Sequence, residues 1–438
     1  MIQASADFFS RVMQRWLPDA FLFAIILTAV IFLSGMVFEE QSATQMANYW
    51  GGGFWNLLSF SMQMVLILLF GHILAMTKPI KAGLVQIAKL ANTPAQGIVL
   101  VTAFAVCAAW VNWGFGIVVG FSVAREVAAR VKGIHFPLLI ASVYSGFLVW
   151  HGGLSGSIPL LLASPEQNTL SNLMNGQVID VSQTLFSSQN ITIILALLIS
   201  LPILNLLMMP KDNIVEFQDT FVEEVEIDKS QMSPAEKLEH SPILSYLFAG
   251  LSSLYLFNYF SDGGGLNLNT INLLLLTSGV LLHGNPYNYL VALKKAIGCT
   301  SGIVLQYPIY AGLMGMMVQS GLAESVSNWF VEISSQDSFS LLTFFSAGMV
   351  NFFVPSGGGQ WAVQAPIVIP AAQSLNVPLP EVAMAVAWGD AWSNMVQPFW
   401  ALPLLGMAGL NLRQIMGYCT VVFLWSGLVI GSLIYFLY

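Results

Sequence analysis

Long apolar runs alternate with short polar segments along almost the whole chain. A helix needs about 20 apolar residues to cross the hydrocarbon core of a bilayer, and nine runs approach or exceed this length. The pattern predicts spanning helices at residues 17–38, 54–77, 135–163, 189–209, 241–261, 270–290, 296–320, 381–407 and 416–438. The expected fold is therefore an all-α polytopic membrane protein with about nine spanning helices.

Two further apolar segments, 98–124 and 339–372, are interrupted by polar residues and glycines. The first contains Asn112-Trp-Gly-Phe-Gly116, and the second contains Asn351-Phe-Phe-Val-Pro-Ser-Gly-Gly-Gly-Gln360. Proline and glycine weaken a helix, and irregular backbone at membrane depth is tolerated only where protein buries it or where it lines a cavity. We therefore expect two re-entrant hairpins, with arms of roughly a dozen residues that end near the middle of the bilayer.

Two of the predicted spans, 135–163 and 381–407, are also broken. The breaks are His151-Gly-Gly-Leu-Ser-Gly-Ser157 and Trp388-Gly-Asp-Ala-Trp-Ser-Asn394. His151 precedes Asp390 by 239 residues, which is also the separation of the two hairpin asparagines. Such collinear matches predict two structural repeats, and the extra span between them turns the second upside down. Inverted repeats whose broken helices meet at the midplane are typical of secondary transporters, and here we expect two related pockets.

The repeats divide the chain into four parts. We expect a first repeat at 1–210, an acidic cytoplasmic linker at 211–240, a connecting span within 241–269, and a second repeat at 270–438. Acidic residues outnumber lysines in the linker, which is typical of a solvated segment.

Composition excludes several classes of protein. The chain has 438 residues, of which 56% are hydrophobic and only 8% charged, whereas soluble domains carry roughly 25% charged residues. It has no basic patch to meet phosphates, so we expect no nucleic-acid partner. The motifs His-Glu-x-x-His and G-x-S-x-G and the P-loop are absent, so we expect neither an enzyme nor an ATP-driven pump.

The placement of charge predicts an orientation. Lys and Arg concentrate in cytoplasmic loops. All 14 Lys and Arg residues fall on one side if both hairpins turn back and the N-terminus is inside. The opposite loops carry acids such as Glu39 and Glu40. We therefore expect a multi-pass protein of the bacterial cytoplasmic (inner) membrane, in contact with lipid, with its N-terminus inside and its C-terminus outside.

The breaks supply the candidate substrate site. No Lys or Arg is expected in the core, which favours an anion with a single charge, held by helix N-termini, hydroxyl and amide groups and a co-bound cation. The predicted substrate-binding residues are Asn112, Gly114, Ser155, Ser157, Ser356, Gly357, Gly358, Gly359 and Gln360.

A cation-coupling group is predicted at the second broken helix. Asp390 is the only acid placed inside a span, where a charged side chain is costly and usually functional. The predicted cation-coupling residues are Asp390, Asn351, Ser393, Asn394 and His151. A proton needs a titratable group, and a Na⁺ ion needs oxygens, which Asp390, Ser393 and Asn394 supply. The sequence leaves H⁺ and Na⁺ as alternatives, and we expect no other cofactor.

The motifs at residues 111–116, 151–159, 354–361 and 389–394 resemble those of the bacterial short-chain fatty acid transporter family, the acetoacetate and butyrate uptake permeases. The resemblance covers essentially the whole chain. It implies a secondary active transporter that takes up short monocarboxylates. The family is similar to a wider ion-transporter group whose members bind a carboxylate and cations at paired hairpin tips. That group often carries Ser-Asn-Thr where this chain has Ser393-Asn394-Met395.

Two other functions are compatible with the pattern. A cation–proton antiporter would use the same breaks without an organic substrate. A non-transport membrane scaffold or a channel would use the acidic linker to contact partners, although packing alone does not require re-entrant breaks. The sequence leaves the oligomeric state open, with a homodimer as one alternative.

Overall fold

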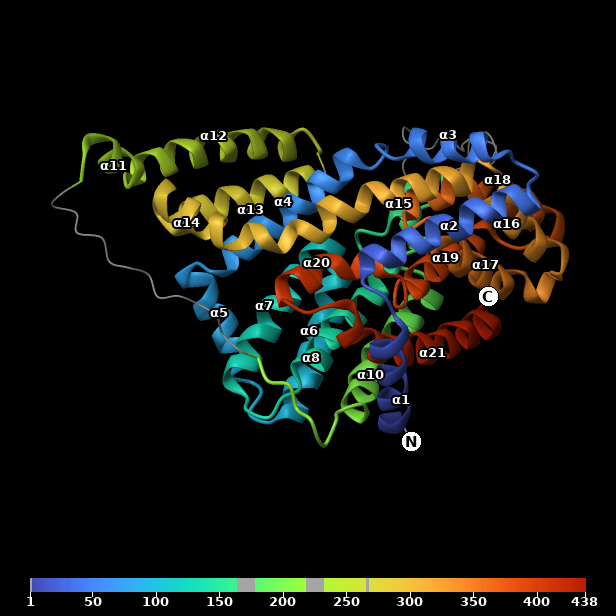
Figure 1. The fold of residues 1–438 in the computed structure, drawn as a ribbon, viewed down its shortest axis with the longest axis horizontal. Helices are drawn as coiled ribbons and strands as arrows, with labels where there is room; N and C mark the ends of the chain where they lie inside the picture. Colours follow the sequence, from blue (N-terminus) through green and yellow to red (C-terminus); the bar gives the residue numbers. More distant parts are fainter. Residues whose placement is uncertain (1, 164–177, 218–231, 265–267) are drawn as a thin grey trace.

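The computed structural model describes residues 2–163, 178–217, 232–264 and 268–438, which form helices and loops without a strand (Figure 1). The prediction of an all-α membrane protein is confirmed. By length and composition, eight of the described helices are apolar enough to cross a membrane. Residues 218–231 of the predicted linker 211–240 lie outside the described residues.

The helices follow one another with short connections, and side-chain caps start several of them. Asp19, Ser42, Thr93 and Ser187 each accept a hydrogen bond from a first-turn N–H group, which satisfies a donor that the helix itself leaves open. The helices are α1 (Ile2–Trp16), α2 (Ala20–Phe38), α3 (Ala43–Gly53), α4 (Leu58–Ala75), α5 (Lys78–Ala88), α6 (Pro94–Val111), α7 (Trp113–Arg130), α8 (Phe136–Gly146), η1 (Phe147–Gly152), α9 (Ser157–Leu162), η3 (Val181–Gln183), α10 (Ser188–Leu207), α11 (Pro234–Glu239), α12 (Pro242–Ser261), α13 (Leu268–His283), α14 (Pro286–Ala296), η5 (Ile297–Thr300), α15 (Ser301–Gln319), α16 (Leu322–Glu332), η6 (Gln336–Ser338), α17 (Phe339–Asn351), α18 (Gly357–Leu375), α19 (Leu379–Ser393), α20 (Pro398–Ala408) and α21 (Leu412–Leu437).

The same order of elements occurs twice. A long helix, an 11-residue helix, a second long helix, a second 11-residue helix, a hairpin, a broken helix and a last long helix run from α2 to α10 and again from α13 to α21. The packing is reciprocal, because α2 and α3 contact α15 while α13 and α14 contact α4. Helix α12 comes between the two sets in the sequence, and it lies at the upper edge of the molecule in Figure 1, where it contacts α13 and α14. This order agrees with the predicted repeats, and their inversion across a bilayer stays a prediction.

Both predicted hairpins are present. One arm, α17, has about the expected length, and the other three are longer. Helices α6 and α7 have 18 residues each, and α17 and α18 have 13 and 19. At 1.5 Å per residue an 18-residue helix is about 27 Å long, close to the thickness of the hydrocarbon core. For the three longer arms the estimate of a dozen residues was wrong because it counted only uninterrupted apolar positions. Helix α7 continues through its charged last turn to Arg130.

Both predicted broken helices are also present, and they bring the four interruptions together. Helix α8 leads into the 3-10 helix η1, a loop and α9, while α19 ends at Ser393 and α20 begins at Pro398. Proline suits a first helical position, because its missing N–H would have no partner there. The segment η1 contacts α6, α7 and α19, and α9 contacts α18 and α19.

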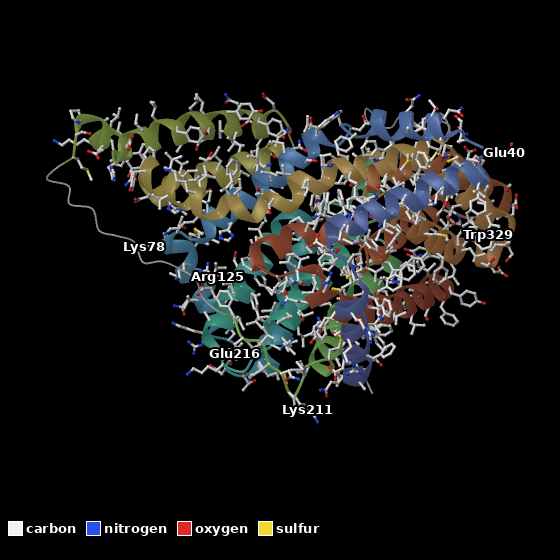
Figure 2. The ribbon with its side chains drawn as sticks, in the orientation of Figure 1. Glu40, Lys78, Arg125, Lys211, Glu216 and Trp329 are labelled. Carbon is white, nitrogen blue, oxygen red and sulfur yellow. The ribbon has the colours of Figure 1, made fainter. Side chains whose placement is uncertain are left out.

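Four of the charged residues labelled in Figure 2 can be compared with the predicted orientation. Figure 2 shows Lys78, Arg125 and Lys211 toward the left and bottom of the view, and Glu40 at the opposite upper right. The first group belongs to the predicted cytoplasmic loops and Glu40 to the predicted outer loops. The distribution is therefore consistent with the orientation, which remains a prediction.

Candidate substrate and cation site

A cavity of about 490 Å³ lies where the two hairpin tips meet the first broken helix. No charged side chain of the described residues lines it. Its polar wall contains an amide, three hydroxyls and two glycines, and its apolar wall contains four aromatic rings. The polar residues are Asn112, Ser155, Ser157, Ser356, Gly357 and Gly358, and the aromatic residues are Phe60, Trp113, Trp150 and Trp400.

The first hairpin tip is fastened to the first broken helix. Asn112 is extended between α6 and α7. The N–H of Trp113, which opens α7, donates to Ser155 Oγ at 3.0 Å, and the N–H of Leu154 donates to the carbonyl of Trp110 at 2.8 Å. A Cβ at Gly153 would lie 2.2 Å from that same carbonyl oxygen, so only glycine allows this approach. The contact places Asn112 and Ser155 side by side on the cavity wall.

The second hairpin tip presents the start of a helix. Ser356 caps α18, and its Oγ accepts from the N–H of Gly359 at 3.4 Å. The N–H groups of the two preceding residues, Gly357 and Gly358, also belong to the first turn of α18, where the helix offers them no acceptor. Both glycines line the cavity. A helix N-terminus carries roughly half a positive charge, so this wall is suited to an anion.

Behind Trp150, which lines the cavity, a histidine of the first repeat contacts an acid of the second repeat. His151 Nδ1 lies 2.8 Å from Asp390 Oδ2, and the two side chains are 0% and 1% exposed. His151 Nε2 accepts from the N–H of Ile158 at 3.1 Å. Because Nε2 acts as an acceptor, this network assigns the ring hydrogen to Nδ1, which donates it to the carboxylate. The two residues at equivalent positions of the repeats therefore form a direct pair.

The amide of Asn351 lies among oxygens of the second broken helix. Its Nδ2 is 2.8 Å from the Asp390 carbonyl, 2.9 Å from Ser393 Oγ and 2.7 Å from Asn394 Oδ1. An amide nitrogen has two hydrogens to donate, so three oxygens share them. Among the described residues, Asn351 Oδ1 and Asp390 Oδ1 are also buried without a hydrogen-bond partner.

Asn394 Nδ2, a donor of the same group, is buried without a partner among the described residues as well. The two unpartnered oxygens fit a cation, because a buried oxygen without a donor is costly. A proton on Asp390 or a small cation near it would satisfy the free oxygens. In the described ranges no three His, Cys, Asp or Glu side chains come together. A metal ion here would therefore depend on neutral amide, hydroxyl and carbonyl oxygens beside one carboxylate, a donor set that suits Na⁺.

Comparison with known proteins decides the family. A family model described as "Short chain fatty acid transporter" matches residues 1–437. The chain belongs to this family. The transporter is 46% identical over 435 residues to a protein of Escherichia coli (strain K12), with 98% of each chain covered. It is 44% identical over 451 residues to one of Haemophilus influenzae (strain ATCC 51907 / DSM 11121 / KW20 / Rd), with both chains fully covered. Both relatives are named "Putative short-chain fatty acid transporter".

Among solved structures, the transporter is similar to the Alcanivorax borkumensis YdaH transporter, whose structure was described as having an unusual topology. The sequences are 14% identical, the match covers 95% of this chain and 98% of the other, and the TM-score is 0.41.

Most of the predicted substrate residues of the transporter lie on the cavity, but three do not. Gly114 packs toward Ile67, whose Cδ1 would be 2.7 Å from an added Cβ. The N–H of Gly359 is directed to Ser356. Gln360 is buried and donates to the Ala347 carbonyl and to Gln364 within the second hairpin. The residues on the cavity are Asn112, Ser155, Ser157, Ser356, Gly357 and Gly358; their roles stay predictions.

The five predicted cation-coupling residues of the transporter form one buried network. Asn351 joins Asp390, Ser393 and Asn394, and His151 joins Asp390. None of the five lines the cavity. The network is separated from it by Trp150, which lines the cavity and stacks on the His151 ring with centroids 4.1 Å apart.

The predicted substrate-binding residues do not include the apolar lining of the cavity, to which Phe60 and Trp400 belong. Trp400 follows the second break by a few residues, so a search that included the start of α20 would have found it. Phe60 lies in an uninterrupted span and its local sequence carries no signal, because only the packing of α4 turns it toward the hairpin tips.

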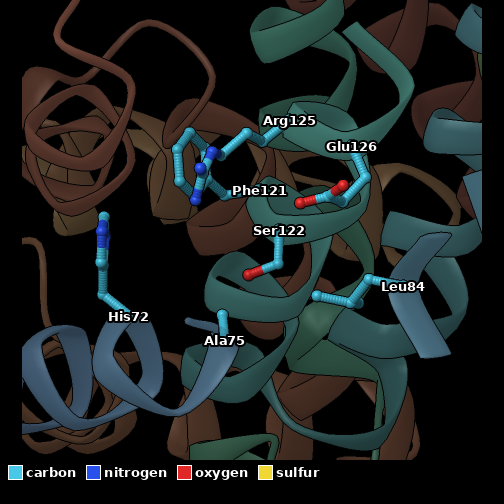
Figure 3. A pocket seen from close by; sticks show the side chains of 7 residues that line it. All are labelled: His72, Ala75, Leu84, Phe121, Ser122, Arg125 and Glu126. Carbon is cyan, nitrogen blue, oxygen red and sulfur yellow. The ribbon is translucent and has the colours of Figure 1, made fainter. Parts of the chain in front are cut away.

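A second, much smaller cavity of about 10 Å³ lies between α4, α5 and α7. Figure 3 shows His72 and Ala75 of α4 facing Ser122 and Arg125 of α7. A volume of this size has room for about one water molecule. It contains none of the predicted site residues and is too small for an organic substrate.

Proposed function

We propose that the protein takes up short monocarboxylates such as butyrate and acetoacetate across the bacterial cytoplasmic membrane, coupled to H⁺ or Na⁺. Membership of the family supports the substrate class. The observation that carries the proposal is the single cavity shared by both hairpin tips and the first broken helix. A site built from two repeats is where substrates bind in transporters of inverted repeats.

The two walls of the cavity suit the two ends of a fatty acid anion. Its carboxylate would meet the N-terminus of α18 and the hydroxyls of Ser155, Ser157 and Ser356, with Asn112 beside them. Its acyl chain would lie against the aromatic rings. With no charged side chain of the described residues on the wall, a second negative charge on the substrate would lack a partner, which favours monocarboxylates over dicarboxylates.

The cation would bind at Asp390, with Asn351, Ser393, Asn394 and His151. Its charge would offset the carboxylate of the substrate through the thin layer formed by Trp150 and Gly357. Alternating access would then follow from movement of one group of helices past the other, by rocking or by an elevator motion, with the N-terminus inside and the C-terminus outside.

Transport by purified protein tests the proposal. We expect proteoliposomes to accumulate labelled butyrate when a gradient of pH or of Na⁺ is imposed, and the effective gradient identifies the coupling ion. Asp390→Asn keeps the size of the side chain but removes its charge, so accumulation should fall at least tenfold. Asp262→Asn, at the exposed end of α12, is the matched control and should transport normally.

Three results would contradict the proposal or one of its parts. Wild-type vesicles that accumulate none of the C2 to C6 acids under either gradient would remove the proposed substrate. Proton flux driven by a cation without any fatty acid would instead identify an antiporter. Unchanged accumulation by Asp390→Asn would remove this carboxylate from the coupling mechanism.

A further inference from the structure

Three of the four aromatic rings on the apolar wall of the cavity come from three elements that are separate from η1, which carries Trp150. Phe60 lies on α4, Trp113 at the start of α7 and Trp400 on α20. The ring centroids of Trp113 and Trp400 are 5.1 Å apart, those of Phe60 and Trp400 5.9 Å, and those of Phe60 and Trp113 6.3 Å. These separations are typical of rings in contact, so the three side chains close this side of the cavity.

Further aromatic residues pack against the wall on the side away from the cavity. Phe60 stacks on Tyr307 with centroids 6.1 Å apart, and Tyr307 stacks on Phe399 at 3.9 Å. Trp113 and Trp400 are only 8% and 4% exposed, whereas Phe60 is half-buried. Phe60 is therefore the most exposed of the three rings, and its contact with Tyr307 supports it on one side.

The polar wall is formed by different elements. Ser356, Gly357 and Gly358 belong to the second hairpin tip, and Ser155 to the loop before α9. An anion held by these groups directs the rest of its chain into the remaining volume, whose lining includes the three rings. The acyl chain is then the part of the substrate that the rings contact.

We propose that Phe60, Trp113 and Trp400 form a tail subsite that determines which acyl chain lengths are transported, with Phe60 as the principal determinant. This inference rests on the proposed function. The depth of the subsite sets how many methylene groups are removed from water, and each buried methylene changes affinity by about fourfold. A chain that is too long meets the rings, since packed aromatic walls do not yield without cost.

Two substitutions at Phe60 change the depth in opposite directions. Phe60→Ala removes the ring and deepens the tail subsite, so the preference should shift toward hexanoate and octanoate. Phe60→Trp extends the ring into the cavity and should shift it toward acetate and propionate. For each variant, inhibition constants of the C2 to C8 acids are measured against uptake of labelled butyrate in proteoliposomes. We expect the ratio of the hexanoate to the butyrate constant to change by at least about fourfold.

A phenylalanine on the same helix provides the control. Phe70 is also half-buried and packs against the core, but it does not line the cavity. Ten residues along a helix separate it from Phe60 by about 15 Å. Phe70→Ala should leave the order of inhibition unchanged. Trp400→Phe, which keeps an aromatic ring, is the second wall variant if Phe60→Ala cannot be reconstituted, and it should also favour longer chains.

The outcomes separate this inference from the proposed function. Opposite shifts for Phe60→Ala and Phe60→Trp, without a shift for Phe70→Ala, support the tail subsite. Butyrate uptake by the wild type with one unchanged chain-length profile in all wall variants would overturn the inference and leave the function intact. Failure of the wild type to transport any of the acids would contradict the proposed function itself.

Discussion

At the scale of single residues, Gly357 connects the substrate wall to the buried pair. A Cβ at this position would lie 2.6 Å from His151 Cε1 and 3.2 Å from the Trp150 ring. A distance of 2.6 Å is well below ordinary van der Waals contact between carbon atoms. Because Gly357 has no side chain, the second hairpin tip can pack against the His151 ring, whose Nδ1 contacts Asp390.

This close contact makes Gly357→Ala a sensitive substitution. We expect the added methyl group to lift the hairpin tip from His151 and to lower butyrate uptake by about tenfold, which corresponds to roughly 1.4 kcal/mol. Gly250→Ala, in the middle of α12, is the control, because no atom lies within 4 Å of an added Cβ there. It should keep full uptake and gain a little helix stability. Equal rates for both variants would contradict the role given to Gly357.

Comparison of the two halves of the sequence pointed to residues that the structure brings together, although their roles stay predictions. The equal separation of the pairs Asn112/Asn351 and His151/Asp390 placed all four residues near the breaks, and the structure brings His151 and Asp390 into contact. Side-chain direction was beyond the same reasoning. Gln360 stands beside three glycines in the sequence, yet its amide donates within the second hairpin.

At the scale of elements, the two hairpins have taken different roles. Asn112 at the first tip lines the cavity, whereas Asn351 at the second is fully buried and bonded to the second broken helix. The sequence predicted two related pockets. At the second hairpin tip, the Asn351 amide is bonded to the second broken helix and does not line the cavity. The two repeats are therefore similar in their backbone but differ in what these side chains do.

The different roles predict different effects of the same substitution. Asn351→Ala removes the donor shared by three oxygens, and we expect it to lower the free energy of unfolding by about 2 kcal/mol. Asn112→Ala removes a cavity residue and should raise the KM for butyrate several-fold with little effect on stability. Thermal unfolding in detergent and uptake kinetics measure the two quantities. An equal loss of stability in both variants would contradict the assignment.

Elements were predictable in proportion to their apolar length. The breaks were located within a few residues because proline and glycine gather there. The four 11-residue helices α3, α5, α14 and α16 were missed, because a search for about 20 consecutive apolar residues cannot detect short helices with one polar side. Helix α1 was missed for the same reason, although it packs along α21, where Gly417 lies against Ser10.

At the scale of the whole molecule, reciprocal packing produces a shared centre. Helices of each half support the other, since α2 and α3 contact α15 while α13 and α14 contact α4. The hairpins and broken helices contact one another, since η1 contacts α6, α7 and α19 and α9 contacts α18 and α19, and the breaks of both halves meet there. Three of the four interruptions, together with Phe60 of α4 and Trp400 of α20, thus enclose a cavity of about 490 Å³, which is the volume a transported anion would occupy in our account.

Protection of one cavity residue by substrate tests this central claim most directly. Cys107, Cys299 and Cys419 are first replaced by serine or alanine, and Ser356→Cys then places a single thiol at the start of α18. We predict that butyrate slows modification of this thiol by a small soluble reagent, with half-maximal protection at the KM for uptake, and that succinate does not. Modification at the same rate with and without butyrate, in a variant that still transports it, would contradict the account.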